Sequence, residues 1–165
     1  MKILSVSENS TGALLGLKPG DRIEAIDGSR VRDIIDYRFK SSDENIVLRV
    51  RHKDRIEEYD IDKDYDDDLG LEFDDFRIRK CANDCIFCFV DQNPPGMRDA
   101  LYFRDGDFRL SFLHGHYITM TNMGWKELKR IVDQRLTPLY ISVHVTQPDK
   151  DRKSTRLNSS HVLIS

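Results

Sequence analysis

Residues 81–88 read CANDCIFC and contain all three cysteines of this 165-residue chain. Three residues separate Cys81 from Cys85, two separate Cys85 from Cys88, and Phe87 directly precedes the last cysteine. An odd number of cysteines in one short loop excludes a disulfide framework. Thiolates at this spacing can surround one cuboidal iron–sulfur cluster, which gives three irons one ligand each and leaves the fourth iron open to a small molecule.

A zinc site is the alternative interpretation of the same loop. Structural zinc takes four ligands, so the three cysteines would need a histidine such as His114 or His116 to complete a Cys3His set. Structural zinc ligands typically come as two short pairs, whereas this sequence has one triplet. The spacing therefore favours the iron–sulfur cluster, and the zinc site stays open as the alternative.

The segment after the cysteines is predicted to alternate strands with a helix. Short apolar runs predict strands at 76–79, within 108–120 and at 138–143. Thr121 or Asn122 is expected to cap the helix between the last two strands. Its apolar face would comprise Trp125, Leu128, Ile131 and Val132. This order predicts an α/β domain whose strands are parallel and buried on both faces.

The segment before the cysteines is predicted to be a small β-rich domain with one helix. We expect strands at 3–7 and 46–50, a hairpin turn at Asp27-Gly28 and a helix within 31–39. The expected core residues are Ile3, Val6, Leu14, Leu17, Ile23, Ile26, Ile34, Ile46 and Leu48. An apolar set of this size predicts a domain that folds on its own, with modest stability.

Two motifs in this first segment resemble a bacterial PDZ domain. Residues 16–28, GLKPGDRIEAIDG, resemble the corner that leads such a domain into a core strand. Residues 69–73, LGLEF, resemble its carboxylate-binding loop, which here would follow the other strands as in a permuted PDZ-like domain. The resemblance implies a peptide or protein partner bound along a sheet edge. The alternative is that the module only packs against the second half of the chain.

Charge divides the chain into the same two segments. Residues 1–75 hold 12 Lys and Arg against 20 Asp and Glu, a balance of −8, whereas residues 76–165 hold 14 against 9, a balance of +5. The basic second half is compatible with an anionic substrate or cofactor, although differently solvated surfaces explain the same division. The acidic run at 60–68 lacks the glycine and glutamate positions of a calcium-binding EF-hand loop.

The sequence offers no signal for a membrane or for nucleic acid. No run of about 18 apolar residues occurs. The first residues are too polar for the core of a secretory signal peptide. We therefore expect a cytoplasmic protein.

The cysteine triplet, with Phe87 before its last cysteine, resembles the signature of radical S-adenosylmethionine (SAM) enzymes. Residues 81–92, PGMR at 95–98 and RLSFL at 109–113 together resemble a bacterial radical SAM family with an N-terminal PDZ-like domain and a C-terminal domain of unknown function. This resemblance covers residues 1–152. The resemblance implies a [4Fe-4S] cluster held by the three cysteines, with Phe87 packed beside it. It implies that the open iron binds SAM, which the reduced cluster cleaves to a 5′-deoxyadenosyl radical.

The resemblance also implies further contacts with SAM. The turn Gly115-His116-Tyr117 corresponds to one whose backbone contacts the SAM amino group, although the family has asparagine where this chain has His116. Ser142 and His144 would share one face of the third strand and point into a barrel, near SAM or the substrate. An electron donor of the flavodoxin or ferredoxin type is implied. No catalytic residue and no substrate follow from the resemblance.

The expected domains are residues 1–75, PDZ-like, and 76–152, the N-terminal part of a radical SAM domain. A full βα barrel needs about 200 or more residues. Residues 76–152 suffice for about three βα units, so we expect a truncated βα barrel of the radical SAM type. Residues 153–165 resemble an extraneous tail. The prediction is a radical SAM enzyme that is incomplete and inactive alone; the alternative is a PDZ-type interaction module with a structural zinc loop.

Overall fold

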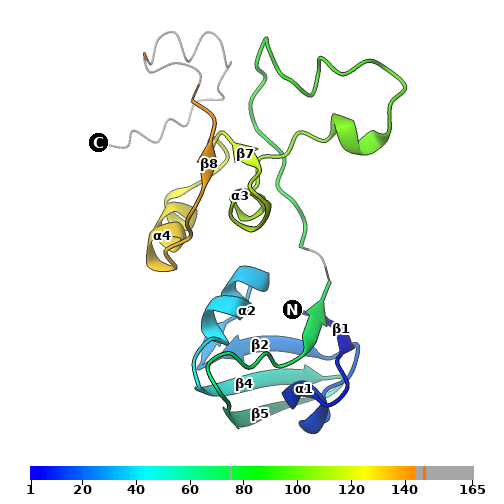
Figure 1. The fold of residues 1–165 in the computed structure, drawn as a ribbon, viewed down its shortest axis with the longest axis vertical. Coiled ribbons are helices and arrows are strands. Elements are labelled where there is room, and N and C mark those ends of the chain that lie inside the picture. Colours follow the sequence, from blue (N-terminus) through cyan, green and yellow to red (C-terminus); the bar gives the residue numbers. More distant parts are fainter. Residues whose placement is uncertain (75, 144–146, 148–165) are drawn as a thin grey trace. The chain divides into compact units, whose positions relative to one another are not determined.

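The computed structural model describes residues 1–74, 76–143 and 147. The chain divides into two compact units, Met1–Phe76 and Arg77–Ser165, which are called the N-terminal unit and the C-terminal unit below (Figure 1). Each unit has its own secondary structure.

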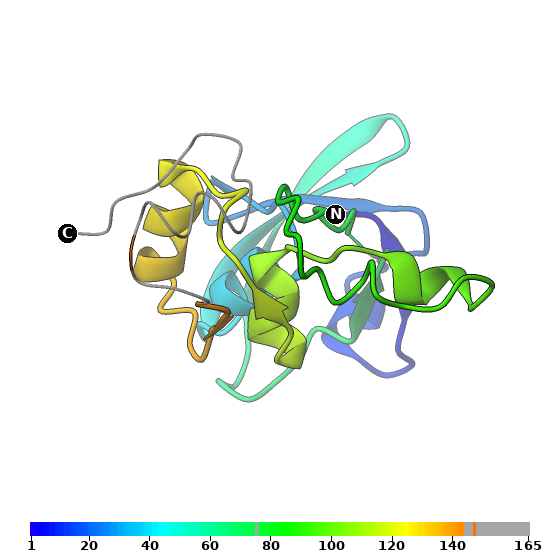
Figure 2. The same cartoon turned by 90° about the horizontal axis from the view of Figure 1, so that it is seen from above.

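A four-stranded antiparallel sheet in the order β3-β2-β4-β5 forms most of the N-terminal unit. Its strands are β2 (Arg22–Ile26), β3 (Ser29–Arg30), β4 (Asn45–His52) and β5 (Arg55–Asp62). The β4–β5 hairpin is the longest strand pair and can be followed in Figure 2. Sequence analysis predicted β4 but missed β5, whose apolar positions are interrupted by charged residues.

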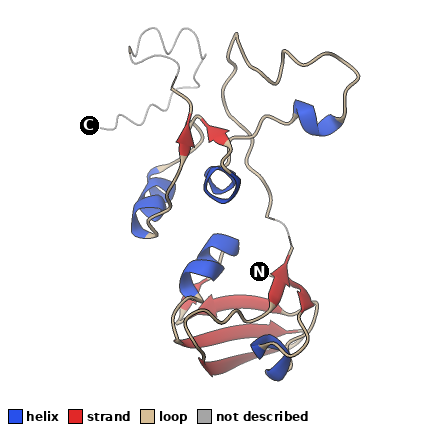
Figure 3. Ribbon diagram, viewed as in Figure 1, coloured by secondary structure: helices blue, strands red, loops and turns tan. Residues whose placement is uncertain are grey.

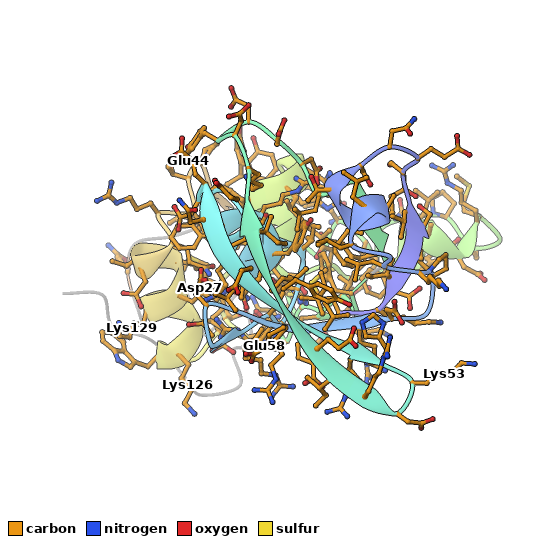
Figure 4. The ribbon with its side chains drawn as sticks, turned by 90° about the horizontal axis from the view of Figure 1, so that it is seen from below. Asp27, Glu44, Lys53, Glu58, Lys126 and Lys129 are labelled. Carbon is orange, nitrogen blue, oxygen red and sulfur yellow. The ribbon has the colours of Figure 1, made fainter. Side chains whose placement is uncertain are left out.

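Two residues explain the tight β2–β3 hairpin. Asp27 and Gly28 both have positive φ, 49° and 68°, as a two-residue type I′ turn requires. The Asp27 side chain, labelled in Figure 4, accepts a hydrogen bond of 2.8 Å from the Val47 backbone N–H through Oδ1. The predicted hairpin turn is therefore confirmed.

A second pair of strands joins the two ends of the N-terminal unit. β1 (Ile3–Val6) pairs antiparallel with β6 (Leu71–Phe73), the strand of the LGLEF motif. The short helix α1 (Thr11–Leu14) lies against the chain just before β6. Gly12 permits this close approach, because a Cβ at that position would lie 2.6 Å from the Leu69 carbonyl oxygen. The other helix, α2 (Ile34–Lys40), begins after Asp33, whose side chain accepts from the Asp36 N–H.

The core of the N-terminal unit agrees with most of the predicted residues. Ile3, Leu17, Ile23, Ile26, Ile46 and Leu48 are buried, and Val6 and Ile34 pack against them. The prediction that Leu14 is a core residue is wrong, because Leu14 is 84% exposed. The reason is that α1 is a single turn that buries Gly12. The β-rich N-terminal fold is confirmed.

The C-terminal unit consists of short elements, coloured by type in Figure 3. They are a 3-10 turn η1 (Asp99–Tyr102), helices α3 (Phe108–His114) and α4 (Trp125–Asp133), and strands β7 (Tyr117–Ile118) and β8 (Tyr140–Ile141). β7 and β8 pair in parallel, as predicted for this half. The prediction that these strands are buried on both faces is wrong, because Tyr117 is 71% exposed and Ile141 is 44% exposed.

One strand predicted in this unit is absent from the described structure, and the strand predicted within 108–120 is limited to the two residues of β7. Residues 108–114 form α3 instead, because Asp107 caps its N-terminus and Gly115 ends it in the left-handed conformation, with φ 73°. A short apolar run of this kind fits a helix or a strand equally well. Residues 76–79 form no strand; the strand-type pairing next to them is an isolated antiparallel bridge between Lys80 and Asp105.

The predicted helix α4 exists, but its details differ from the prediction. It begins after Gly124 and not after Thr121 or Asn122, because the Glu127 side chain accepts from the Gly124 N–H at 3.0 Å. Its predicted apolar face is not buried as a whole, since Trp125 is 76% exposed. Lys126 and Lys129, labelled in Figure 4, also extend from this helix.

A βα barrel is not seen in the part of the chain that the structure describes. The sheets there are mostly antiparallel, and the parallel pairing is that of β7 with β8. Among the same residues, no helix is both long and apolar enough to cross a bilayer.

Candidate metal centre

The base of the cysteine loop is a short antiparallel contact. The Cys81 N–H donates to the Arg104 carbonyl at 2.7 Å, and the Gly106 N–H donates to the Arg79 carbonyl at 3.2 Å. A Cβ on Gly106 would lie 2.7 Å from the Cys81 Cα, so only glycine permits this approach. The two ends of the loop that carries the cysteines are therefore fixed next to each other.

Cys85 and Cys88 flank one turn of this loop, and a second turn follows Cys88. The Cys88 N–H donates to the Cys85 carbonyl at 3.2 Å, and the Cys88 carbonyl accepts from Asp91 and Gln92. The Cys81 sulfur lies 3.8 Å from the Thr119 hydroxyl, one residue after β7. All three residues are partly exposed thiols, not disulfides.

The pKa of the Cys85 thiol depends on its burial and on the two neighbouring sulfurs. Burial raises the pKa of the Cys85 thiol, and the Cys81 and Cys88 sulfurs raise this pKa further. Among residues 1–74, 76–143 and 147, however, no three Cys, His, Asp or Glu side chains are gathered closely enough to hold a metal ion. The donor chemistry fits a group that takes three thiolates, whereas the sulfur positions are not those of an assembled site.

Arg104 connects two segments of the cysteine loop, one between Cys81 and Cys85 and one after Cys88. Its Nε donates to Asp91 Oδ1 at 3.0 Å, and its Nη2 pairs with the other oxygen of the same carboxylate. Its Nη1 donates to the Asn83 carbonyl at 3.2 Å and lies 3.9 Å from Asp84. The hydrogen bonds from Arg104 lower the pKa of the Asp91 carboxyl. Sequence analysis missed Arg104, which stands 13 and 21 residues from these partners.

The predicted turn Gly115-His116-Tyr117 lies beside the base of the loop. Gly115 donates to the Ser111 carbonyl as the C-cap of α3. His116 Nδ1 lies 2.7 Å from the carboxylate of Asp105, the residue after Arg104. The turn therefore joins α3 to β7 next to the segment that pairs with Cys81.

The other predicted site residues are placed differently. Ser142 follows β8 and does not lie within it, and its N–H donates to the Ile118 carbonyl at 2.8 Å. The predicted shared strand face with His144 is not tested, because His144 lies outside the described residues. Phe87 is partly buried between the last two cysteines along the chain. His114 and His116 join no three-ligand group with the cysteines in the described structure.

Asp107 is a buried carboxylate that fixes this region and that sequence analysis also missed. It accepts from the Arg79 and Arg109 N–H groups, at 2.9 and 3.0 Å, and from the Arg109 guanidinium at 2.9 and 2.6 Å. Burial alone would raise its pKa, but these hydrogen bonds together hold the pKa of Asp107 below its usual range. The backbone of Arg79, two residues before Cys81, is thus hydrogen-bonded to the residue that caps α3.

The cysteine triplet falls inside a family match. Residues 63–162 match the model of the Radical SAM-like domain, which is more than half of the chain. This chain belongs to the Radical SAM-like domain family. The radical SAM-like match reaches ten residues beyond the predicted domain end at 152.

A second match concerns the N-terminal unit. Residues 2–52 match the PDZ domain model, which ends with β4 and leaves out β5 and β6. The two matches confirm the two-domain layout of this radical SAM-like protein, and the PDZ match indicates interaction with a peptide or protein. No curated protein matches the chain.

Proposed function

We propose that this radical SAM-like chain holds a [4Fe-4S] cluster through Cys81, Cys85 and Cys88 and binds SAM at the open iron. The observation that carries the proposal is the cysteine triplet on a loop with a fixed base, inside the family match. The finer assignment, to the bacterial radical SAM family with a PDZ-like domain, is part of the same proposal.

The chemistry would be one-electron reduction of SAM. When bound, the cluster would be held by Cys81, Cys85 and Cys88 and would supply the electron for reductive cleavage of the C5′–S bond of SAM to methionine and a 5′-deoxyadenosyl radical. An electron donor of the flavodoxin or ferredoxin type would supply that electron. Because such a cluster needs a reducing compartment, we place the activity in the cytoplasm.

The chain's own residues would bind and orient the two groups. Phe87 offers an apolar side chain between two of the proposed ligands, which would help to exclude water from the cluster. In the turn Gly115-His116-Tyr117, the Gly115 and His116 N–H groups already donate within the cap of α3. The N–H groups of the SAM amino group need acceptors, so the carbonyl oxygens of this turn are the groups it would use. Ser142 and His144 are proposed to lie near SAM or the substrate.

Metal analysis tests the proposal. After anaerobic reconstitution with iron and sulfide we expect a brown protein with about four irons per chain, since one triplet holds one cluster. Stoichiometric zinc without visible absorbance would contradict this, and would favour the interaction module with a structural zinc loop. Formation of 5′-deoxyadenosine under dithionite then tests SAM cleavage separately from cluster binding.

A further inference from the structure

We infer that Arg104 is a positioning residue for the proposed cluster: it holds the cysteine loop folded and places a positive charge on that loop, against the carboxylates of Asp84 and Asp91. The inference rests on the proposed function and names a determinant of the cluster's stability and reduction potential. It is carried by the contacts of one guanidinium group with the segment between Cys81 and Cys85 and with Asp91 after Cys88.

The contacts of the Arg104 side chain lie on both sides of Cys85 and Cys88 along the chain. On one side, its Nη1 binds the carbonyl of Asn83, which lies between Cys81 and Cys85. On the other side, its Nε and Nη2 hold both oxygens of Asp91, three residues after Cys88. A two-pronged guanidinium–carboxylate pair fixes direction as well as distance. One side chain thus connects the segment between the first two cysteines to the segment after the third.

The backbone of Arg104 fixes the same loop at its base. Its carbonyl accepts the Cys81 N–H at 2.7 Å, so main chain and side chain of one residue bind three points of the loop. Gly106, two residues later, permits the close approach to Cys81. The guanidinium is therefore held in place by a backbone contact that does not depend on the cluster.

The charges around the loop give Arg104 its second role. The Asp84 carboxylate lies 3.9 Å from its Nη1, and the Asp91 carboxylate is paired with its Nη2. Three thiolates next to two carboxylates would repel one another without a cation. The neighbouring cation, Lys80, points its ammonium group at the Phe103 ring, 5.6 Å from its centre. Among these described contacts, Arg104 is the cation that faces the carboxylates of the loop.

A nearby positive charge also affects electron transfer to a cluster. Reduction adds negative charge, which a cation stabilises, so loss of the cation makes reduction harder. Asn83 lies between the proposed ligands Cys81 and Cys85, and its carbonyl accepts from Arg104. Displacing Arg104 would therefore disturb both the charge and the hydrogen bonding of the loop that carries the sulfurs.

The test compares Arg104→Gln, Arg104→Lys and Asp91→Asn with the unchanged chain. Lysine keeps the charge but not the planar fork, so it separates the two roles. Arg98→Gln is the matched control, because it removes an exposed cation from the same loop, and the Arg98 side chain makes no capping hydrogen bond. The readouts are the rate of iron loss to a chelator, the midpoint potential of the cluster, and amide hydrogen exchange of the cluster-free protein.

For Arg104→Gln we expect iron loss about tenfold faster or more, and a midpoint potential shifted to more negative values. Arg104→Lys and Asp91→Asn should lose iron faster, with the lysine variant close to the original potential. Without cluster, Arg104→Gln should speed exchange at the amides of Cys88, Asp91 and Gln92, which are hydrogen-bonded in the folded loop. Arg98→Gln should match the unchanged chain in all three measurements.

The failures are distinguishable. If the unchanged chain binds no cluster, the proposed function is wrong, and the inference falls with it. If the cluster forms but Arg104→Gln keeps the original iron-loss rate or the original potential, the role of Arg104 is overturned while the proposed function stands. If Arg104→Gln takes up no cluster, a normal iron-loss rate in Arg104→Lys would overturn the positioning role.

Discussion

The N-terminal and C-terminal units are stabilised in different ways. The N-terminal unit has a continuous apolar core, built from both sheets and from Tyr37 of α2. In the described part of the C-terminal unit, buried charged side chains accompany the apolar ones; Asp107 and Arg130 are examples. An apolar core excludes water by itself, whereas buried charges must keep their partners. The comparison predicts that the first unit folds alone and that the second depends on its polar contacts and on a bound group.

The largest expected effect concerns the cysteines. Alanine at any one of Cys81, Cys85 or Cys88 should remove most of the iron, because each cysteine is proposed to ligate its own iron. Hydrogen exchange should then rise within residues 77–143 and stay unchanged in β2, β4 and β5. Equal increases in both units would show that the N-terminal unit is not independent.

The next effect concerns the apolar core. In a fragment of residues 1–76, which we expect to unfold cooperatively, Leu48→Ala should lower the free energy of unfolding by about 2–5 kcal/mol. Leu48 is fully buried in β4, and its neighbour Val47 is 37% exposed. Val47→Ala is therefore the control, with an expected change of about 0.5 kcal/mol. Denaturant unfolding measures both; equal losses, or no cooperative transition, would contradict the comparison.

A smaller effect, on acid stability, is expected at Asp107. Its pKa is lowered in the folded protein, so its contribution is present above the ordinary aspartate pKa of about 3.9 and is lost as pH falls through the lower folded value. Asp107→Asn should destabilise the C-terminal unit by about 1–3 kcal/mol near neutral pH and flatten its acid dependence below about pH 4.

Exchange at the amides of α3, followed against pH, measures this effect. Asp133→Asn is the control, because Asp133 is an exposed partner of Lys129. The same acid dependence in Asp107→Asn as in the original chain would show that another group titrates.

The smallest effect is expected at His116. The proposed contact of this turn with SAM is made by its backbone, so His116→Asn should leave both iron content and SAM affinity within about twofold, well under 1.4 kcal/mol. Isothermal titration with SAM on the reconstituted protein measures the affinity. A loss of about tenfold would show that the imidazole, which faces Asp105, takes part in binding.

Local sequence was enough to predict part of both units. The Asp27-Gly28 turn needs positive φ at two neighbouring residues, which this dipeptide supplies without help from the rest of the fold. The alternation of β4 and the spacing of Cys81, Cys85 and Cys88 are likewise readable along the chain. Patterns of this kind succeed because the residues that decide them are adjacent in the sequence.

Tertiary structure decided what local patterns left open. The run at 108–114 could have been a strand, but the Asp107 cap, supported by Arg79 from 28 residues away, favours the helix α3. In the sequence, Arg104 is not distinguishable from other loop arginines. In the folded chain it pairs with Cys81 through its backbone, and its guanidinium then contacts Asn83 and Asp91. No repeating pattern in the sequence identifies the partner of a charged side chain. Only closure of the loop therefore determines which carboxylate and which carbonyl Arg104 binds.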